Sequence, residues 1–393
     1  MSDVCNFESG YAFSSDDYKD KGTPLVRISN IQDGLVSLDN CVYIEGDIDK
    51  RFIINNGDLL IAMSGATTGK MGVYQYDCPA LLNQRVGNIK VNTSLLLQKY
   101  RDYFMQSQGD LILKLSYGGA QPNVSAKIIS DLFIPIPSLN EQEKIVAEIE
   151  KWFGFIDEIE NGKIELESHI KKTKSKILDL AISGKLVPQV PDDEPAIELL
   201  KRINPDFKPC DNSHYENIEF DIPQNWVWAT IGDIFEHNTG KALNASNPNG
   251  TMLDYITTSN LYWDRFELSI IKQMPFTESE IERCIVRKGD LLICEGGDVG
   301  RAAIWDYDYN IMIQNHIHRL RGKVDICTRY FFYLFMHYKL HNLIGGKGVA
   351  IQGLSSRDLH NLIIPVPSLK EQYDIASSID LYFSKLDMIT AEL

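Results

Sequence analysis

The sequence repeats itself after 230 residues, and this duplication restricts the possible folds more than any other feature. The clearest copies are ISDLFIPIPSLNEQEKIVAEIE (129–150) and LHNLIIPVPSLKEQYDIASSID (359–380), which share the order Pro-x-Pro-Ser-Leu-x-Glu-Gln. Earlier segments pair in the same order along the chain, beginning with 2–13 and 232–243. Because a long-period repeat marks one structural unit used more than once, the sequence predicts two copies of one domain.

A glycine-rich stretch in each copy resembles a phosphate-binding loop. In LLIAMSGATTGKMGVY (59–74), three residues instead of four separate Gly65 from Gly69, and Met71 stands where a magnesium-binding hydroxyl is needed. The second copy, GDLLICEGGDVGRAAI (289–304), keeps the glycine turn but not the spacing. We therefore predict a strand–turn–strand element in both copies and no nucleotide site.

After each Pro-x-Pro motif, apolar residues follow the spacing of a coiled-coil seam. The first helix, of about 44 residues, would span roughly 65 Å, which is too long for the inside of one domain. The second helix is the obvious partner for its seam. The predicted seam residues are Ile145, Ile149, Trp152, Ile156, Ile159, Leu166, Ile170, Ile177, Leu180, Ile375, Ile379, Tyr382, Leu386 and Ile389.

These patterns predict an α+β fold, in which two homologous mixed α/β domains are joined by long antiparallel coiled-coil helices. Between the helix and the second domain, the sequence predicts a proline-rich acidic connector with a short helix near Pro195. The predicted segments are domain 1 (1–139), spacer helix (140–185), connector (186–222), domain 2 (223–369) and second, shorter spacer helix (370–393).

Composition leaves DNA open as a partner. The net charge is −15, but the connector 186–222 alone carries nine acidic and three basic side chains. Segments 1–139 and 223–369 each carry 15 acidic side chains, against 12 and 14 basic ones, so a basic face is neither shown nor excluded. No long apolar run or signal peptide is present, and seven cysteines lack a C-x-x-C pair. We therefore expect a cytoplasmic protein without a membrane partner.

At this point the sequence resembles the specificity subunit of type I restriction–modification systems. The resemblance rests on the ordered duplication, on both Pro-x-Pro-Ser-Leu-x-Glu-Gln segments, on AISGKLVPQ (181–189) and on IPQNWVWATIGDI (222–234). It covers essentially the whole chain. Two features depart from it, because the first copy starts at Met1 without the segment that precedes the second, and the second helix is about half as long as the first.

The resemblance implies that each copy is a target recognition domain that reads one half of a split DNA sequence. The helices would fix the distance between the half-sites and dock other subunits. The implied partners are double-stranded DNA, methyltransferase (M) subunits and, optionally, restriction/motor (R) subunits. S-adenosylmethionine, magnesium and ATP would be bound by those partners, and this chain would hold no cofactor.

Polar residues at matching positions of the two copies are the candidates for DNA contact. They are Lys70, Gln84, Arg85, Gln121, Asn123, Arg301, Asn315, His316, Lys347 and Gln352. Lys70 and Arg301 end the glycine turns, where each could meet a phosphate or remain a solvated charge. Candidates within apolar stretches could instead satisfy buried backbone groups, and those in glycine-rich loops could serve as turn residues only.

No catalytic set is recognisable in the sequence. The Asn/Asp-Pro-Pro-aromatic segment of DNA amino-methyltransferases is absent, as are a nucleophile elbow and a dinucleotide fingerprint. His337 and His341 lie four residues apart, but no glutamate lies between them, so no metal site is predicted. We predict a non-catalytic DNA-recognition subunit. The alternatives are the specificity subunit of a related motor-less system and a protein-binding coiled-coil scaffold.

Overall fold

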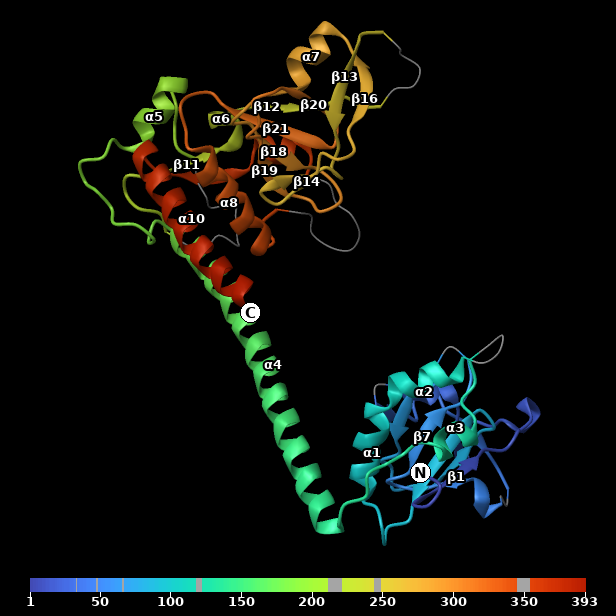
Figure 1. Ribbon diagram of the computed structural model, residues 1–393. Coiled ribbons are helices and arrows are strands. Elements are labelled where there is room, and N and C mark those ends of the chain that lie inside the picture. The colour runs from blue at the N-terminus through green and yellow to red at the C-terminus, as the bar shows by residue number, and fades with distance from the viewer. Residues whose placement is uncertain are drawn as a thin grey trace. The chain divides into compact units, whose positions relative to one another are not determined.

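The computed structural model describes residues 1–32, 34–46, 49–65, 67–117, 122–210, 221–243, 249–344 and 354–393. The candidate contact residues Gln121, Lys347 and Gln352 lie outside these ranges. The chain divides into two compact units, Met1–Asn161 and Gly162–Leu393, which are described in turn (Figure 1).

The first unit is built on two sheets of short strands. These strands are β1 (Cys5–Ser9), β2 (Thr23–Val26), β3 (Ile31–Gln32), β4 (Gly34–Val36), β5 (Val42–Ile44), β6 (Ile53–Ile54), β7 (Leu59–Ala62), β8 (Met71–Val73), β9 (Ala80–Leu82) and β10 (Val86–Val91). One sheet has the order β1-β10-β7-β8-β4-β3 and the other the order β5-β2-β9-β6. β2 and β9 are parallel, whereas β1, β10, β7 and β8 pair antiparallel.

Helices cover these sheets and lead out of the unit. They are the 3₁₀ helices η1 (Ser15–Asp17), η2 (Ile28–Asn30) and η3 (Lys50–Phe52), and the α-helices α1 (Gln98–Ser107), α2 (Gly109–Ser116), α3 (Ala126–Ser130) and α4 (Leu139–Ile182). The residues of α4 up to 161 belong to this unit. There Val146 of α4 packs with Tyr100 of α1, with Leu96 before α1 and with Val4 before β1. The first part of α4 therefore contributes to an apolar cluster of this unit.

The second unit repeats the same strand arrangement. Its strands are β11 (Val227–Thr230), β12 (Phe235–Thr239), β13 (Thr251–Ile256), β14 (Leu261–Tyr262), β15 (Arg265–Phe266), β16 (Lys272–Phe276), β17 (Ile285–Val286), β18 (Leu291–Cys294), β19 (Ala302–Ile304), β20 (Ile311–Ile313), β21 (Ile317–Gly322) and β22 (Ile363–Val366). The sheet β12-β21-β18-β19 matches β1-β10-β7-β8, and β16-β13-β20-β17 matches β5-β2-β9-β6. The parallel pair β13–β20 likewise matches β2–β9. β11 and β22 form a separate two-stranded sheet.

The helices of the second unit surround a large aromatic core. They are α5 (Ala196–Ile203), α6 (Ile231–Ile234), α7 (Glu278–Cys284), α8 (Thr328–Leu340), α9 (Ser356–His360) and α10 (Leu369–Glu392), together with the second part of α4. α5 begins directly after Pro195, where the sequence predicts a short helix. Among the described residues, no helix combines the length and the apolar character needed to cross a membrane.

The glycine-rich stretches form hairpins in both units. β7 pairs antiparallel with β8, and β18 pairs antiparallel with β19, so the predicted strand–turn–strand element is confirmed. The aspartate shared by the two Gly-Asp-Leu-Leu-Ile segments is buried in each copy. Asp58 accepts the backbone N–H of Asn55 (3.0 Å), and Asp290 accepts that of Arg287 (2.7 Å). The repeated aspartate therefore fixes the turn that leads into the first hairpin strand.

The glutamine that closes each Pro-x-Pro motif is fully buried and joins two helices. The Gln142 side chain accepts the N–H of Leu97 (2.9 Å), just before α1, and Gln372 accepts that of Cys327 (3.0 Å), just before α8. Each glutamine also donates to the carbonyl of the second proline of its motif, at 2.9 and 3.0 Å. Both glutamines thus satisfy an orphan N–H at a helix start and fix where the long helix leaves its domain.

α10 runs antiparallel to the second part of α4 (Figure 1). Lys163 bonds the carbonyl of Leu393, and Lys174 pairs with Asp387, so residue numbers fall along α10 as they rise along α4. The helices span Leu139–Ile182 and Leu369–Glu392, against the predicted 140–185 and 370–393.

The apolar seam is only partly covered. Ile170, Ile375 and Ile379 are buried. Ile145, Ile149, Ile177, Leu180 and Leu386 are half-buried, and Trp152, Ile156, Ile159, Leu166, Tyr382 and Ile389 are exposed. The predicted partnership of α10 with the seam is therefore seen along the second part of α4, where α10 contacts Lys163 and Lys174.

Candidate nucleic-acid interface

Three separate segments of the first unit meet at one edge of its sheets. The N–H of Met63, after β7, bonds the carbonyl of Arg85 in the β9–β10 turn (2.8 Å). The N–H of Val124 then bonds the carbonyl of Met63 (2.7 Å), and that of Gln84 bonds Tyr11, after β1 (2.9 Å). The backbone therefore holds the glycine turn, the β9–β10 turn and the loop before α3 together.

The second unit assembles the matching segments through matching bonds. The N–H of Glu295, after β18, bonds the carbonyl of His316 (2.9 Å), and that of Leu354 bonds Glu295 (2.9 Å). Asn315 bonds Lys241, after β12, at 3.0 Å. Since the same backbone bonds occur at equivalent positions, the two loop clusters are copies of one surface.

In the first unit the structure brings the described candidate residues to this surface. Lys70, Gln84, Arg85 and Asn123 all have exposed side chains on the converging segments. Gln84 and Arg85 lie in the turn between β9 and β10, so their side chains do not satisfy buried backbone groups. Amide and guanidinium groups of this kind can donate to base edges and phosphate oxygens.

In the second unit the described residues of the equivalent surface are less basic. His316 is exposed, and its Nδ1 lies 3.5 Å from Oε2 of Glu295 on the neighbouring turn. Asn315 is half-buried beside it. Glu295 was not found from the sequence, because its place beside His316 depends on the pairing of β18 with β21.

Arg301 turns inward, unlike its counterpart Lys70. Its Nη2 donates to the carbonyl of Thr258 (2.6 Å), and its guanidinium lies 5.0 Å from the centroid of the Tyr262 ring. Arg265 lies 4.9 Å from the same ring. Arg301 is therefore neither a solvated charge nor free to approach a phosphate. It holds the β14–β15 hairpin against the glycine turn through a hydrogen bond and a cation–π contact.

A pair of histidines supports the loop cluster of the second unit. Nε2 of His237 lies 2.9 Å from Nδ1 of His318, whose Nε2 donates to the carbonyl of Leu354 (2.8 Å). Burial, and then the nearby His318, His360 and Arg319, lower the pKa of His237 to about 4. Burial also lowers the pKa of His318, so both rings are neutral at pH 7. This pair is not recognisable in the sequence, because a cross-strand contact leaves no local motif.

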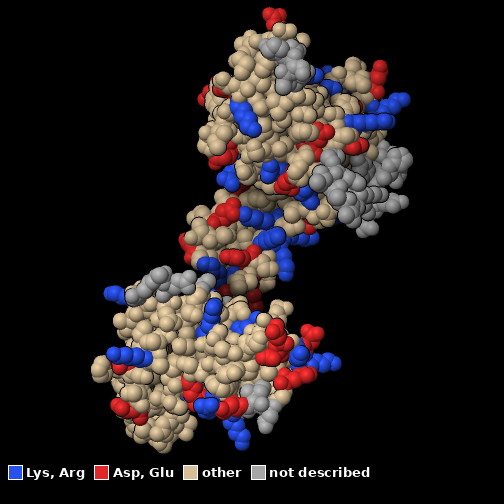
Figure 2. Space-filling model, turned by 90° about the vertical axis from the view of Figure 1, so that its right-hand side faces the viewer, with Lys and Arg blue, Asp and Glu red and all other residues tan. Residues whose placement is uncertain are grey.

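Positive and negative side chains are interspersed on the face shown in Figure 2, where neither unit carries a uniformly basic surface. A hollow of about 530 Å³ lies beside the loop cluster of the first unit. Aromatic, basic and acidic side chains line it together: Tyr11, Phe13, Phe52, Lys19, Arg51, Asp17, Glu45 and Asp49. Aromatic and charged groups thus adjoin the exposed turn residues.

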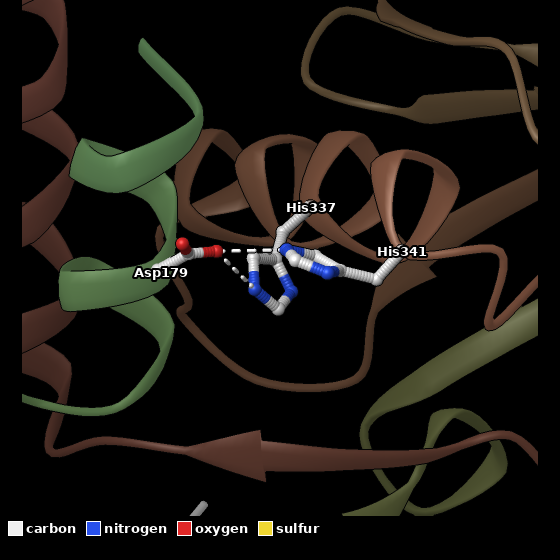
Figure 3. A group of neighbouring side chains, drawn as sticks. All are labelled: Asp179, His337 and His341. Carbon is white, nitrogen blue, oxygen red and sulfur yellow. Dashed lines mark hydrogen bonds and ion pairs between the residues drawn. The ribbon is translucent and has the colours of Figure 1, made fainter. Parts of the chain in front are cut away.

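A second polar cluster ties α4 to α8 (Figure 3). Oδ1 of Asp179 lies 2.7 Å from Nε2 of His341 and 3.2 Å from Nε2 of His337. Burial, and then the neighbouring His341, lower the pKa of His337 to about 4, so this ring is neutral at pH 7 and donates through Nε2–H. The carboxylate accepts from both rings and joins the two helices.

The same three side chains are a donor set that zinc also uses, and their ligand atoms lie within 4.8 Å of one another. Only His337 and His341 stand out in the sequence, because Asp179 comes from a distant part of the chain. The absence of a metal at this place stays a prediction.

Comparison with known proteins identifies the family. The profile of the family described as "Type I restriction modification DNA specificity domain" matches residues 1–168 and 223–393. The chain belongs to this family. Each match covers one copy of the duplicated domain; the first continues into α4 as far as residue 168, and the second includes the whole of α10. The family expected from the sequence is confirmed.

Individual relatives match the whole chain at low identity. The EcoBI specificity subunit of Escherichia coli is 22% identical over 402 residues, covering 100% of this chain and 80% of the relative. The EcoKI specificity subunit of Escherichia coli K12 is 22% identical over 390 residues, covering 95% and 78%. The crystal structure of the HsdS subunit from Thermoanaerobacter tengcongensis has a TM-score of 0.61 at 16% identity, covering 99% and 91%. This likeness confirms the predicted fold class.

Proposed function

We propose that the chain is the DNA-recognition subunit of a type I restriction–modification system and that each repeated unit reads one half of a bipartite site. The observation that carries this proposal is the loop cluster that occurs twice, built by the same backbone bonds in a chain of the specificity family. In the first unit Lys70, Gln84, Arg85 and Asn123 would contact DNA, and in the second unit His316 would do so.

In this proposal the chain selects the DNA and leaves the reaction to its partners. Methyltransferase subunits would bind S-adenosylmethionine and methylate adenine, and restriction/motor subunits would bind magnesium and ATP. α4 and α10 would act as spacer and docking surface, since they expose apolar residues such as Trp152 and Ile159. A cytoplasmic location belongs to the same proposal, because the protein would meet its DNA partner there.

Mapping of adenine methylation tests the recognition role directly. Cells would carry the cognate methyltransferase, shown to be active with another specificity subunit, with and without this chain. We expect methylation at a split motif with a fixed gap only when the chain is present. An unchanged methylation map would contradict the proposal. Binding of the purified complex to DNA should then weaken steeply with salt, whereas a protein-binding scaffold would show no such dependence.

A further inference from the structure

Side chains from two helices of the second unit meet at one point (Figure 3). Asp179 comes from the second part of α4, and His337 and His341 come from α8 and its C-terminal end. The N–H of His341 bonds the carbonyl of His337 (3.1 Å), so the two histidines lie one helical turn apart on the same side of α8. The centroids of their rings are 4.4 Å apart. Both imidazoles therefore face the carboxylate together.

The ligand atoms of this group are spaced almost as a zinc ion requires. Nε2 of His337 lies 3.2 Å from Oδ1 of Asp179, and Nε2 of His341 lies 2.7 Å from the same oxygen. With bonds of about 2.0–2.1 Å, tetrahedral zinc holds its ligand atoms roughly 3.3 Å apart. The first distance already fits, and the second must widen by about half an ångström. His341 can supply this movement, because 44% of its side chain is exposed.

The charges of the group also favour a zinc ion. Among the described residues, Asp179 pairs with no lysine or arginine, and Lys339 of α8 pairs with Asp298 instead (2.9 Å). Burial, and then the neighbouring His341, lower the pKa of His337 to about 4, so its imidazole is neutral at pH 7, as a metal ligand must be. Zinc binds carboxylate and imidazole ligands together, whereas Ca²⁺ and Mg²⁺ prefer oxygen ligands.

The helices that carry these ligands are fixed by the core of the second unit. Leu178 of α4 and Phe335 of α8 are buried in one apolar cluster. The His337 side chain is only 6% exposed, whereas His341 opens to solvent, so a metal ion can enter from the side of His341. Within the described ranges, no fourth histidine, cysteine or carboxylate joins the group. A water molecule would therefore complete the tetrahedron.

We propose that Asp179, His337 and His341 bind one zinc ion, with water as the fourth ligand, and that this ion cross-links α4 to α8. The sequence predicts no metal here because no glutamate lies between the two histidines. That argument excludes the zinc-protease motif, but the carboxylate of this site comes from α4. On binding, the ring proton of each histidine moves from Nε2 to Nδ1, and zinc takes its place beside Asp179. The site lies outside the loop cluster, so it does not depend on the proposed DNA recognition.

Metal titration of the full chain tests this site. The protein would be stripped with EDTA, desalted and titrated with zinc in competition with a chromophoric chelator. We expect one saturable zinc ion per chain and a higher urea midpoint with zinc than without it, because a ligand that binds only the folded state stabilises that state. Cobalt(II) should bind at the same place and show the visible absorption of tetrahedral coordination. It should show no near-ultraviolet thiolate band, because the group contains no cysteine.

Matched variants identify the ligands. Loss of an outer-shell partner alone typically lowers metal affinity about 10–100-fold, so His341→Ala, which removes a ligand, should weaken zinc binding at least about a hundredfold, and Asp179→Asn at least about tenfold. His169→Ala, at an exposed histidine of α4, should change neither affinity nor stoichiometry. Circular dichroism of the metal-free His341→Ala variant should show an intact fold, because this side chain is exposed. Unchanged affinity in His341→Ala, or a thiolate band with cobalt, would overturn the proposal. Absence of saturable binding would also overturn it and leave the prediction from the sequence standing.

Discussion

Several side chains that are identical in the two copies form hydrogen bonds with the protein's own backbone and thereby stabilise its loops. Asn30 and Asn260, from the repeated Ser-Asn pair, are both buried. The Asn30 side chain accepts the N–H of Arg27 and donates to the carbonyl of Ser37, both at 3.0 Å. Asn260 accepts the N–H of Thr257 (2.9 Å) in the same way. The two copies share this residue because the loop that it closes has the same backbone hydrogen bond in each unit.

Residues that differ between the copies occur on the outer surface of the loop clusters. Gln84 and Arg85 are exposed in the first unit, and the second unit has Asn315 and His316 at the same places. Two domains with one fold but different exposed side chains are suited to reading two different half-sites. The comparison of copies thus separates structural residues from candidate recognition residues.

Lys70→Ala tests the recognition surface of the first unit. Lys70 is exposed at the end of the glycine turn, so we expect it to neutralise a phosphate. Its loss should weaken binding to specific and non-specific DNA alike and lower the slope of log K against log salt by about one. Lys151→Ala, at an exposed lysine of α4, is the control and should change neither quantity. Unchanged salt dependence in Lys70→Ala would remove Lys70 from the interface.

The sequence could not predict that the Lys70 side chain is exposed whereas the Arg301 side chain turns inward. Both follow a glycine turn, and the duplication itself suggested equal roles. Arg301 turns inward because the β14–β15 hairpin brings the ring of Tyr262 and the carbonyl of Thr258 to it. Such contacts join residues that lie 39 and 43 positions apart, so no local pattern records them. The presence of the turns was predictable, whereas the direction of their side chains was not.

The buried histidines of the second unit make its stability depend on pH. The pKa of His237 and that of His337 are both lowered to about 4, chiefly by burial. In the unfolded chain these rings take up protons below about pH 6.5, while the folded rings resist protonation until pH 4. The contribution of these histidines to the free energy of unfolding should therefore be fully present above pH 6.5 and should be lost as the pH decreases towards 4. Urea midpoints measured from pH 7.5 to 4.5 would show this loss.

The first unit supplies the control for this prediction. Phe7 and Gly87 stand there in place of His237 and His318, and the Phe7 ring occupies the space beside Gly87. The double variant His237→Phe with His318→Gly should retain the fold and lose much of the acid sensitivity. An undiminished pH dependence would assign the effect to other groups.

At the scale of elements, the long helices show where sequence periodicity stops being informative. The heptad pattern predicted α4 and α10 closely, because helix period and caps are local properties. Gly184 ends α4 with a φ of +68°, as its sequence position suggests. The pattern could not show which part of the seam is covered, because coverage depends on how far the partner helix extends.

Two isoleucines on the second part of α4 test this distinction. Ile170 is 7% exposed and lines the groove between α4 and α10, whereas Ile164 is 65% exposed. Ile170→Asp would bury a carboxylate in an apolar contact and should destabilise the second unit by at least about 2 kcal/mol. Ile164→Asp should cost less than about 0.5 kcal/mol. Equal urea midpoints for the two variants would contradict the observed pairing of α10 with α4.

At the scale of the whole molecule, the chain consists of two units that each close their own sheets and core. The duplication, and hence the repeated topology, was readable from the sequence because long matching segments occur in one order. The exposure of Phe133 was not readable from the sequence, because the burial of a side chain depends on segments that lie far away along the chain.

Independent units should read DNA independently, and exchanging one of them tests the proposed function for the whole chain. Residues 1–138 would be replaced by the matching unit of another family member, with α4 and the second unit unchanged. Because the second loop cluster and the spacer helices keep their sequence, we expect one half of the methylated motif to change while the other half and the gap persist. The reciprocal exchange of residues 223–368 should alter the opposite half. If either exchange altered both halves, the loop clusters would act as one composite surface, and the one-unit, one-half-site relation would be wrong.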